Sequence, residues 1–349
     1  MARLLSLRHT HFWWVQRLIL IPVYLFVFVI VVFFLVRVIP GDPVVNAAGG
    51  QNITEEQYLE MQEAMGLSGS LPEQLGAYLG RLVQGDLGTS FSSGAPVLDD
   101  LVRVIPGTVQ NAIVAALAIV LLAFGAGMAV LIRPGSVVAR VAAFVARTAG
   151  AVPDFVLGIF GILLFFVVLG IAPAPIGLYD VTLPPPPTVT GFAIIDAAIA
   201  GRWDVEASIW AHLWLPTLTL ALAYGPMLLK VLIPALQEAA EANSTKFAVS
   251  TGQKTGAVLR SVWRRALPAA LAMFGTIFGF LLGGAVVIEQ LFALQGSAQY
   301  AVNAVNRSDY VALQGILLAI ALISLIVFFA VDIVTGIIDP RRRTSTVAA

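Results

Sequence analysis

Six long apolar segments constrain this chain more than any other feature of its sequence. A bilayer core of about 30 Å is crossed by about 20 apolar helical residues, so each segment is long enough to span a membrane. Hydrophobic residues make up 59% of the 349 positions and charged residues only 11%, which is far from the composition of soluble domains. We therefore predict an all-α polytopic membrane protein with six transmembrane helices, near residues 18–36, 109–132, 148–172, 210–235, 269–292 and 313–338.

The distribution of Lys and Arg predicts the orientation of these helices. The first apolar run is too long for a secretory signal and no small-x-small cleavage site follows it, so we expect a retained anchor. If the N-terminus is inside, 15 of the 20 Lys and Arg residues lie on the inner side. Three of the remaining five lie in the long first outer loop, which carries little topological weight. Both termini are therefore predicted to be cytoplasmic, in the cell membrane.

The predicted spans divide the chain into four segments. Residues 1–36 form an inner segment and the first span, and 37–107 form an acidic outer loop. Residues 108–338 form a five-helix core that contains an inner loop at 237–268, and 339–349 form an inner tail. Within the outer loop, a capping box at Thr54 and the sequence Ser70-Leu71-Pro72-Glu73 each predict the start of a short helix. We expect both helices to lie against the outer mouth of the bundle.

Several classes of chemistry are disfavoured by the sequence. It contains no cysteine, and its three histidines, His9, His11 and His212, are scattered, so we expect no metal site. A net charge of zero argues against nucleic acid as a partner. No G-x-S-x-G is present, and the stretch from Gly252 to Thr255 lacks the pattern of a phosphate loop. We therefore expect neither an enzyme nor a bound cofactor in this chain.

Two acids lie within the predicted spans. We expect Asp154 near the inner end of its span, and Asp332 about 9 Å of helical rise before Ile338. From these positions both can reach the interface or pair with an inner arginine, which favours structural acids over an ion pathway. In the fifth span, glycines recur at four-residue spacing, which allows close packing of another helix or exposure of backbone to a solute. They are Gly275, Gly279 and Gly283, followed by Gly284.

The inner loop at 237–268 is the most informative polar stretch. It is rich in basic residues, and we expect Gly256 to interrupt any continuous helix there. A basic helical elbow of this size, in a chain without a catalytic constellation, indicates a part that is moved by a partner. Its basic residues are Lys246, Lys254, Arg260, Arg264 and Arg265.

Several ordered stretches together resemble the membrane-spanning subunits of ATP-binding-cassette (ABC) importers for dipeptides, oligopeptides and nickel. The resemblance covers nearly the whole chain. It rests on Arg37-Val38-Ile39-Pro40-Gly41-Asp42-Pro43, Gly85-Asp86-Leu87-Gly88-Thr89-Ser90 with Pro96-Val97, Gly283-Gly284-Ala285-Val286-Val287-Ile288-Glu289, Arg307-Ser308-Asp309-Tyr310, Gln314-Gly315, Asp332 and Asp339-Pro340-Arg341.

This resemblance implies a type I ABC importer permease with a coupling helix in the inner loop, which seats in an ATPase subunit. The family glycine falls on Thr255 whereas this chain has Gly256, and Pro268 comes early, so the docking register is defined only to about one residue. The residues implied for coupling are Phe247, Ser250, Thr251, Gly252, Lys254, Thr255, Gly256 and Arg260. We further expect Gly283, Gly284 and Glu289 near the translocation path or its gate.

The implied partners are a homologous permease, two ATP-binding-cassette subunits or domains that bind the ATP, an outer substrate-binding protein, membrane lipid and a peptide substrate. Two alternatives stay open at this stage. One is a self-contained secondary carrier or channel, and the other is an ABC importer for nickel chelates or haem.

Overall fold

The computed structural model describes residues 13–38, 42–48, 53–147 and 150–339. His9, His11 and most of the predicted 339–349 tail lie outside these residues. Apart from an isolated bridge between Thr89 and Pro96, the regular elements of the described residues are all helical, as predicted. They are α2 (Trp13–Arg37), α3 (Pro43–Ala47), α4 (Glu55–Ala64), α5 (Leu71–Val83), α6 (Val97–Ile132), α7 (Val137–Arg147), α8 (Asp154–Gly161), the π-helix η1 (Ile162–Val168), α9 (Ala193–Ile199), α10 (Trp203–Glu241), α11 (Asn243–Ser250), α12 (Thr255–Leu291), α13 (Ser297–Asn306) and α14 (Tyr310–Ile338).

Within the described residues, five helices rather than six are long and apolar enough to cross a membrane. They lie in α2, α6, α10, α12 and α14. The third predicted span, 148–172, differs. Its helical part is confined to Asp154–Val168, about 22 Å long at most, because Pro153 delays its start and Gly170, at φ 63°, ends it.

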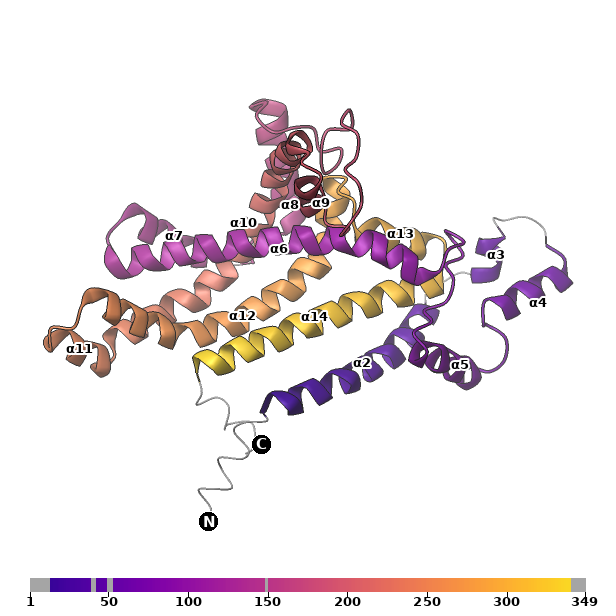
Figure 1. Cartoon of the computed structure of the whole chain (residues 1–349), viewed down its shortest axis with the longest axis horizontal. Helices are drawn as coiled ribbons and strands as arrows, with labels where there is room; N and C mark the ends of the chain where they lie inside the picture. The colour runs from indigo at the N-terminus through magenta and orange to yellow at the C-terminus, as the bar shows by residue number, and fades with distance from the viewer. Residues whose placement is uncertain (1–12, 39–41, 49–52, 148–149, 340–349) are drawn as a thin grey trace, which may run out of the picture.

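The long helices pack in an order that puts α10 at the centre. α10 contacts α6 and α12, α14 packs on α12, and α2 packs mainly on α14. In Figure 1, the axes of α2, α6, α12 and α14 are roughly aligned and form a layer, and α8, α9 and the first part of α10 rise from one side of this layer. The core between α6, α10 and α12 is filled by fully buried aliphatic side chains, among them Ile119, Leu213, Leu236, Ile277 and Leu281.

The two predicted outer helices begin where the sequence indicates. Thr54 accepts a hydrogen bond from Gln57 N at 3.3 Å, and the Gln57 side chain accepts one from Thr54 N at 3.0 Å. Glu73 accepts from Ser70 N at 2.7 Å. Only α5 packs on the bundle, where Tyr78 stacks on Phe33 of α2 at 5.9 Å between ring centroids. α4 buries none of its residues, so the expectation that both lie against the bundle holds for α5 alone.

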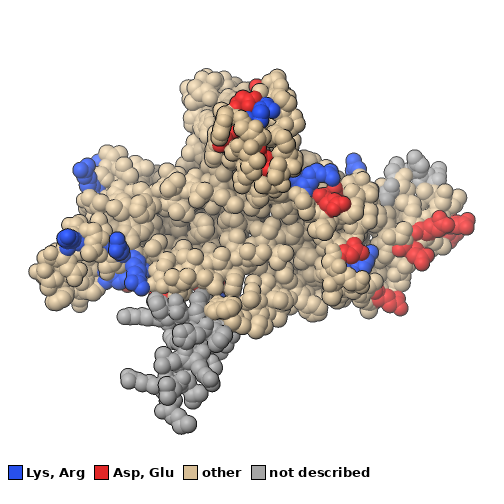
Figure 2. Space-filling model, viewed as in Figure 1, with Lys and Arg blue, Asp and Glu red and all other residues tan. Residues whose placement is uncertain are grey.

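Charge divides the molecule along its long axis. Figure 2 shows Lys and Arg gathered around the end formed by α7, α11 and the start of α12, whereas Asp and Glu dominate the opposite end, around α4. The spans between these ends carry few charges. One is Asp332 of α14, which forms an ion pair with Arg17 of α2, so this acid has the inner-arginine partner that the sequence allowed for it.

The ion pair gives a test of how α2 is held. We expect Arg17→Gln and Asp332→Asn each to lower the midpoint of thermal unfolding in detergent by a few degrees. The double variant should lose less than the sum of the two, because either change alone already abolishes the pair. Strictly additive losses would contradict a direct interaction.

Candidate functional site

The inner loop forms a compact helical elbow between α10 and α12. α10 continues to Glu241, and Ala242, with ψ 143°, separates it from the eight-residue α11. The chain then turns through residues 251–254, where Gly252 adopts φ 74°, a conformation that glycine takes without strain. The prediction that Gly256 interrupts the helix is wrong, because Gly256 lies in the first turn of α12. The helix is interrupted at the turn that contains Gly252 instead.

A single arginine clamps the elbow together. Arg265 of α12 donates to the carbonyl oxygen of Ala239 at 3.0 Å and also to the hydroxyls of Ser244 and Thr245. The buried Thr245 hydroxyl donates to the same Ala239 carbonyl at 2.7 Å. The guanidinium therefore satisfies groups at the end of α10 and the start of α11 together, which its forked set of donors permits. The elbow is fixed to both long helices.

The outer surface of the elbow is exposed among the described residues. The eight residues implied for coupling are all exposed at this one end of the molecule. Phe247 and Val249 of α11 are 68% and 62% exposed, and the Ser250 and Thr251 hydroxyls bond back to the Phe247 carbonyl at 2.9 and 3.0 Å. The elbow thus presents an exposed apolar and basic surface that a partner can contact, and the Phe247 carbonyl on it is already hydrogen-bonded within the elbow.

The predicted path residues lie on different faces of α12. Gly275 and Gly279 face Phe328 of α14, where a Cβ at Gly275 would come within 3.1 Å of the ring, so this part of the glycine stripe serves helix packing. Gly283 is exposed and faces open space. Gly284 instead contacts the Tyr224 hydroxyl of α10 and the carboxylate of Asp154.

Glu289 belongs to a buried junction. It is 2% exposed, and its Oε2 accepts from Ala298 N at 2.9 Å, so its carboxylate lies at the N-terminus of α13, where negative charge is favoured. Thr108 of α6 completes the junction by accepting from Ser297 N at 2.7 Å. Glu289 therefore fixes α13 to α12 and does not share the exposed face of Gly283.

Asp154 is the first residue of α8, at the end of the third helix where the sequence placed it, but it lies far from the elbow. It contacts Gly284 and accepts a 2.8 Å hydrogen bond from Tyr224, and Tyr224 lies seventeen residues before Glu241 in α10. The carboxylate is therefore about 25 Å of helical rise from the elbow. The sequence left open a pairing with an inner arginine, and within the described residues Asp154 makes no such ion pair, because α8 begins well inside the bundle.

At the opposite end, two recognised motifs meet in what we call the outer platform, the loop 85–96 together with the α13–α14 connection 306–310. Asp309 is 1% exposed and accepts from the Ser90 hydroxyl at 2.7 Å and from Ser92 N at 2.9 Å. Its other oxygen caps α14 by accepting from Ala312 N at 3.0 Å. Sequence reasoning quoted both motifs but did not identify this contact.

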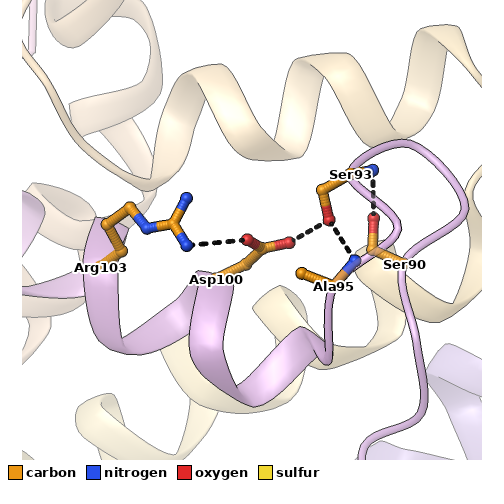
Figure 3. Close-up of polar contacts among 5 residues, drawn as sticks. All are labelled: Ser90, Ser93, Ala95, Asp100 and Arg103. Carbon is orange, nitrogen blue, oxygen red and sulfur yellow. Dashed lines mark hydrogen bonds and ion pairs between the residues drawn. The ribbon is translucent and has the colours of Figure 1, made fainter.

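A second buried acid supports the same loop. Asp100 accepts from the Ser93 hydroxyl at 2.6 Å and lies 3.8 Å from Arg103, as Figure 3 shows, while Ser93 N donates to the Ser90 hydroxyl at 3.2 Å. Burial, and after it the charge of Asp100, raises the pKa of the Tyr300 phenol of α13. The loop is thus held to α6 through Asp100 and to α14 through Asp309.

The Asp309 contacts predict that replacing this residue destabilises the loop 85–96. In Asp309→Asn, an amide group would face donors that need an acceptor, which costs about 1–3 kcal/mol for a buried group. Hydrogen exchange in residues 86–96 should accelerate, whereas the exposed Asp99→Asn should leave it unchanged. Equal exchange in both variants would show that Asp309 does not hold the loop.

The Arg265 clamp predicts a second effect. Arg265→Lys keeps the charge but cannot reproduce bonds to three acceptors on two helices. Amide exchange in residues 243–254 should rise roughly tenfold, the effect of losing one or two exposed hydrogen bonds. Arg260→Lys is the matched control, and exchange as slow in Arg265→Lys as in this control would refute the clamp.

Comparisons with known proteins agree with this architecture. Residues 119–344 match the family described as the binding-protein-dependent transport system inner membrane component, and residues 11–112 match the N-terminal region of such components. The chain is 29% identical to a di/tripeptide transport system permease protein of Pseudomonas aeruginosa, over 93% of this chain and 96% of the relative. It is 30% identical to a probable D,D-dipeptide transport system permease protein of Escherichia coli, over 89% and 92%. It is also 28% identical to a glutathione transport system permease protein of Shigella flexneri, over 94% and 98%. The resemblance in the sequence is therefore confirmed, and this multi-pass membrane protein belongs to the family of inner-membrane components of binding-protein-dependent transport systems.

Proposed function

We propose that the chain is the permease subunit of an ATP-driven ABC importer that moves di- or oligopeptides from an outer binding protein into the cytoplasm. The elbow is the observation that carries this proposal. It is held to α10 and α12 by Arg265, yet Phe247 and Val249 on its outer surface are mostly uncovered by the described residues. Peptide is the substrate class because two of the relatives named above are di- or tripeptide permeases.

In this proposal ATP is bound and hydrolysed by two partner ATPase subunits or domains, and the permease itself holds no cofactor. Closure of the ATPases would displace the elbow through Phe247, Ser250, Thr251, Gly252, Lys254, Thr255, Gly256 and Arg260. Because α10 and α12 are continuous with the elbow, they would move with it. Alternating access is then a rigid-body equilibrium, biased by contacts that differ between the two ATPase states.

The orientation follows from the same arrangement. The basic end would be cytoplasmic, together with both chain termini, since loops rich in Lys and Arg are retained inside. The acidic end and the outer platform would then face the binding protein. A second, homologous permease would complete the conduit across the lipid bilayer.

Reconstitution tests the function directly. We expect proteoliposomes that contain this chain, a second permease, two ATPases and the binding protein to accumulate radiolabelled Ala-Ala only with ATP. Liposomes with this chain alone should accumulate none. Vigorous uptake by the isolated chain, driven by an ion gradient, would instead establish a secondary carrier.

The elbow has its own test within that system. Replacing residues 250–256 with a Gly/Ser linker should abolish Ala-Ala uptake while ATP hydrolysis and membrane insertion persist, because force would no longer reach α12. The same replacement in the 133–136 turn between α6 and α7, at the same end, should leave uptake intact. Normal uptake in the 250–256 variant would refute the coupling role.

A further inference from the structure

Asp154 and Asp332 are both acids of the apolar body, but they differ in their partners. Asp332 pairs with Arg17. Asp154 accepts from Phe155 N at 2.8 Å and from the Tyr224 hydroxyl at 2.8 Å, and within the described residues it makes no ion pair. It also retains intermediate exposure. Both donors are neutral, and the position of Asp154 at the N-terminus of α8 adds only partial positive charge, so no full positive charge among the described residues pairs with this carboxylate.

The depth of Asp154 in the apolar body gives its charge a high free-energy cost. Asp154 lies beside Tyr224, near the middle of the 39-residue α10, where the helix is surrounded by apolar residues. A charged side chain at such depth costs about 2.5–3.5 kcal/mol on insertion scales, and such acids face the bundle interior or a water-filled cavity. Asp154 is still partly exposed, and we therefore expect its open side to face a water-filled path through the bundle and not lipid.

The neighbours of Asp154 identify the face of the conduit. Along α12 the exposed residues recur at spacings of four and three, which places them on one stripe. Gly283 on this stripe adjoins Gly284, against which the Asp154 carboxylate and the Tyr224 hydroxyl pack. The exposed positions are Thr276, Phe280, Gly283, Val287 and Gln290.

Aromatic rings complete the surroundings. Tyr224 stacks on Phe280 with ring centroids 6.1 Å apart and planes 7° from parallel, which fixes the phenol that donates to Asp154. The carboxylate attracts a cation through charge, and the nearby aromatic pair offers an apolar surface for the organic part of such a cation.

We propose that Asp154, held by Tyr224, binds the α-ammonium group of the peptide as it crosses the membrane. This rests on the proposed function, which supplies a peptide with a free amino terminus. The contact is transient and non-covalent, an ammonium donating to the Asp154 carboxylate. Gly284 is required because any side chain there would overlap the Tyr224 hydroxyl and come within 3.1 Å of Asp154 Oδ2.

The test uses the complete reconstituted complex and the maximal rate of Ala-Ala uptake under saturating binding protein. We expect Asp154→Asn to lower this rate at least tenfold, Asp154→Glu to retain most of it, and Tyr224→Phe to lower it severalfold. Gly284→Ala should lower it, whereas Gly225→Ala, a helix glycine of α10 with open space around it, should not. Asp99→Asn controls for loss of an acid elsewhere.

The possible outcomes distinguish a binding role of Asp154 from misfolding and from failure of the proposed function. Variants must assemble with the wild-type yield and unfold at the wild-type temperature, so that a misfolded chain is not mistaken for a binding defect. Wild-type uptake rates in Asp154→Asn, or an Asp154→Glu rate as low as that of Asp154→Asn, would overturn the proposal. If the wild type takes up no Ala-Ala at all, the proposed function itself fails.

The same carboxylate could bind a metal cation, and buffer composition separates the two. Uptake by the wild type in an isotonic sucrose buffer without Na⁺ or K⁺ should equal uptake in either salt, because the peptide brings its own positive charge. A requirement for Na⁺ or K⁺ that disappears in Asp154→Asn would assign the site to the metal ion and overturn the proposal.

Discussion

The high cost of an unsatisfied charge or polar group in an apolar body governs this structure. The acids that enter it are placed where something compensates them. Asp332 has Arg17, Asp309 accepts from three donors, and Glu289 lies at the N-terminus of α13. Each compensated carboxylate also fixes one segment to another, so the same few contacts that make burial tolerable determine how the helices are joined. Asp154 also accepts two hydrogen bonds at a helix N-terminus, but unlike Asp309 and Glu289 it stays partly exposed, and in our proposal a passing ammonium group supplies the opposite charge.

The elbow shows how a rigid connection is built from weak parts. α11 has only eight residues, too short to be a stable helix alone, and its exposed face makes no contact within the described residues. Arg265 and Thr245 compensate by bonding to one carbonyl at the end of α10. Arg264 adds a bond to the Ile338 carbonyl of α14 at 3.2 Å. A partner that displaces α11 therefore acts on three long helices.

Much of this fold follows from local sequence, and the exceptions have physical causes. Apolar run length located five long helices, and the capping patterns located the starts of α4 and α5, because these signals act within one or two turns. The third span was overestimated because Pro153 and Gly170 restrict a helix inside an apolar run. The Arg265 clamp, the Ser90–Asp309 contact and the Tyr224–Asp154 bond join residues distant in sequence, which no local periodicity reveals. The sequence placed Asp154 correctly at the start of its helix, but its distance from the elbow depends on how α8 packs on α10 and α12, which local sequence does not reveal.

The continuity of α12 links the two ends of the molecule. The helix starts beside the elbow at Thr255, passes Gly284 next to the Asp154 carboxylate, and reaches Glu289, which holds α13. α13 leads in turn to Asp309, which holds the outer loop. Packed interiors transmit displacement because they have few voids to absorb it. A shift imposed at the elbow therefore reaches the outer platform along one helix and two buried carboxylates, and it passes the face of Asp154 on the way. In the proposed importer, opening at one end and release of a bound cation midway would then be two consequences of a single motion.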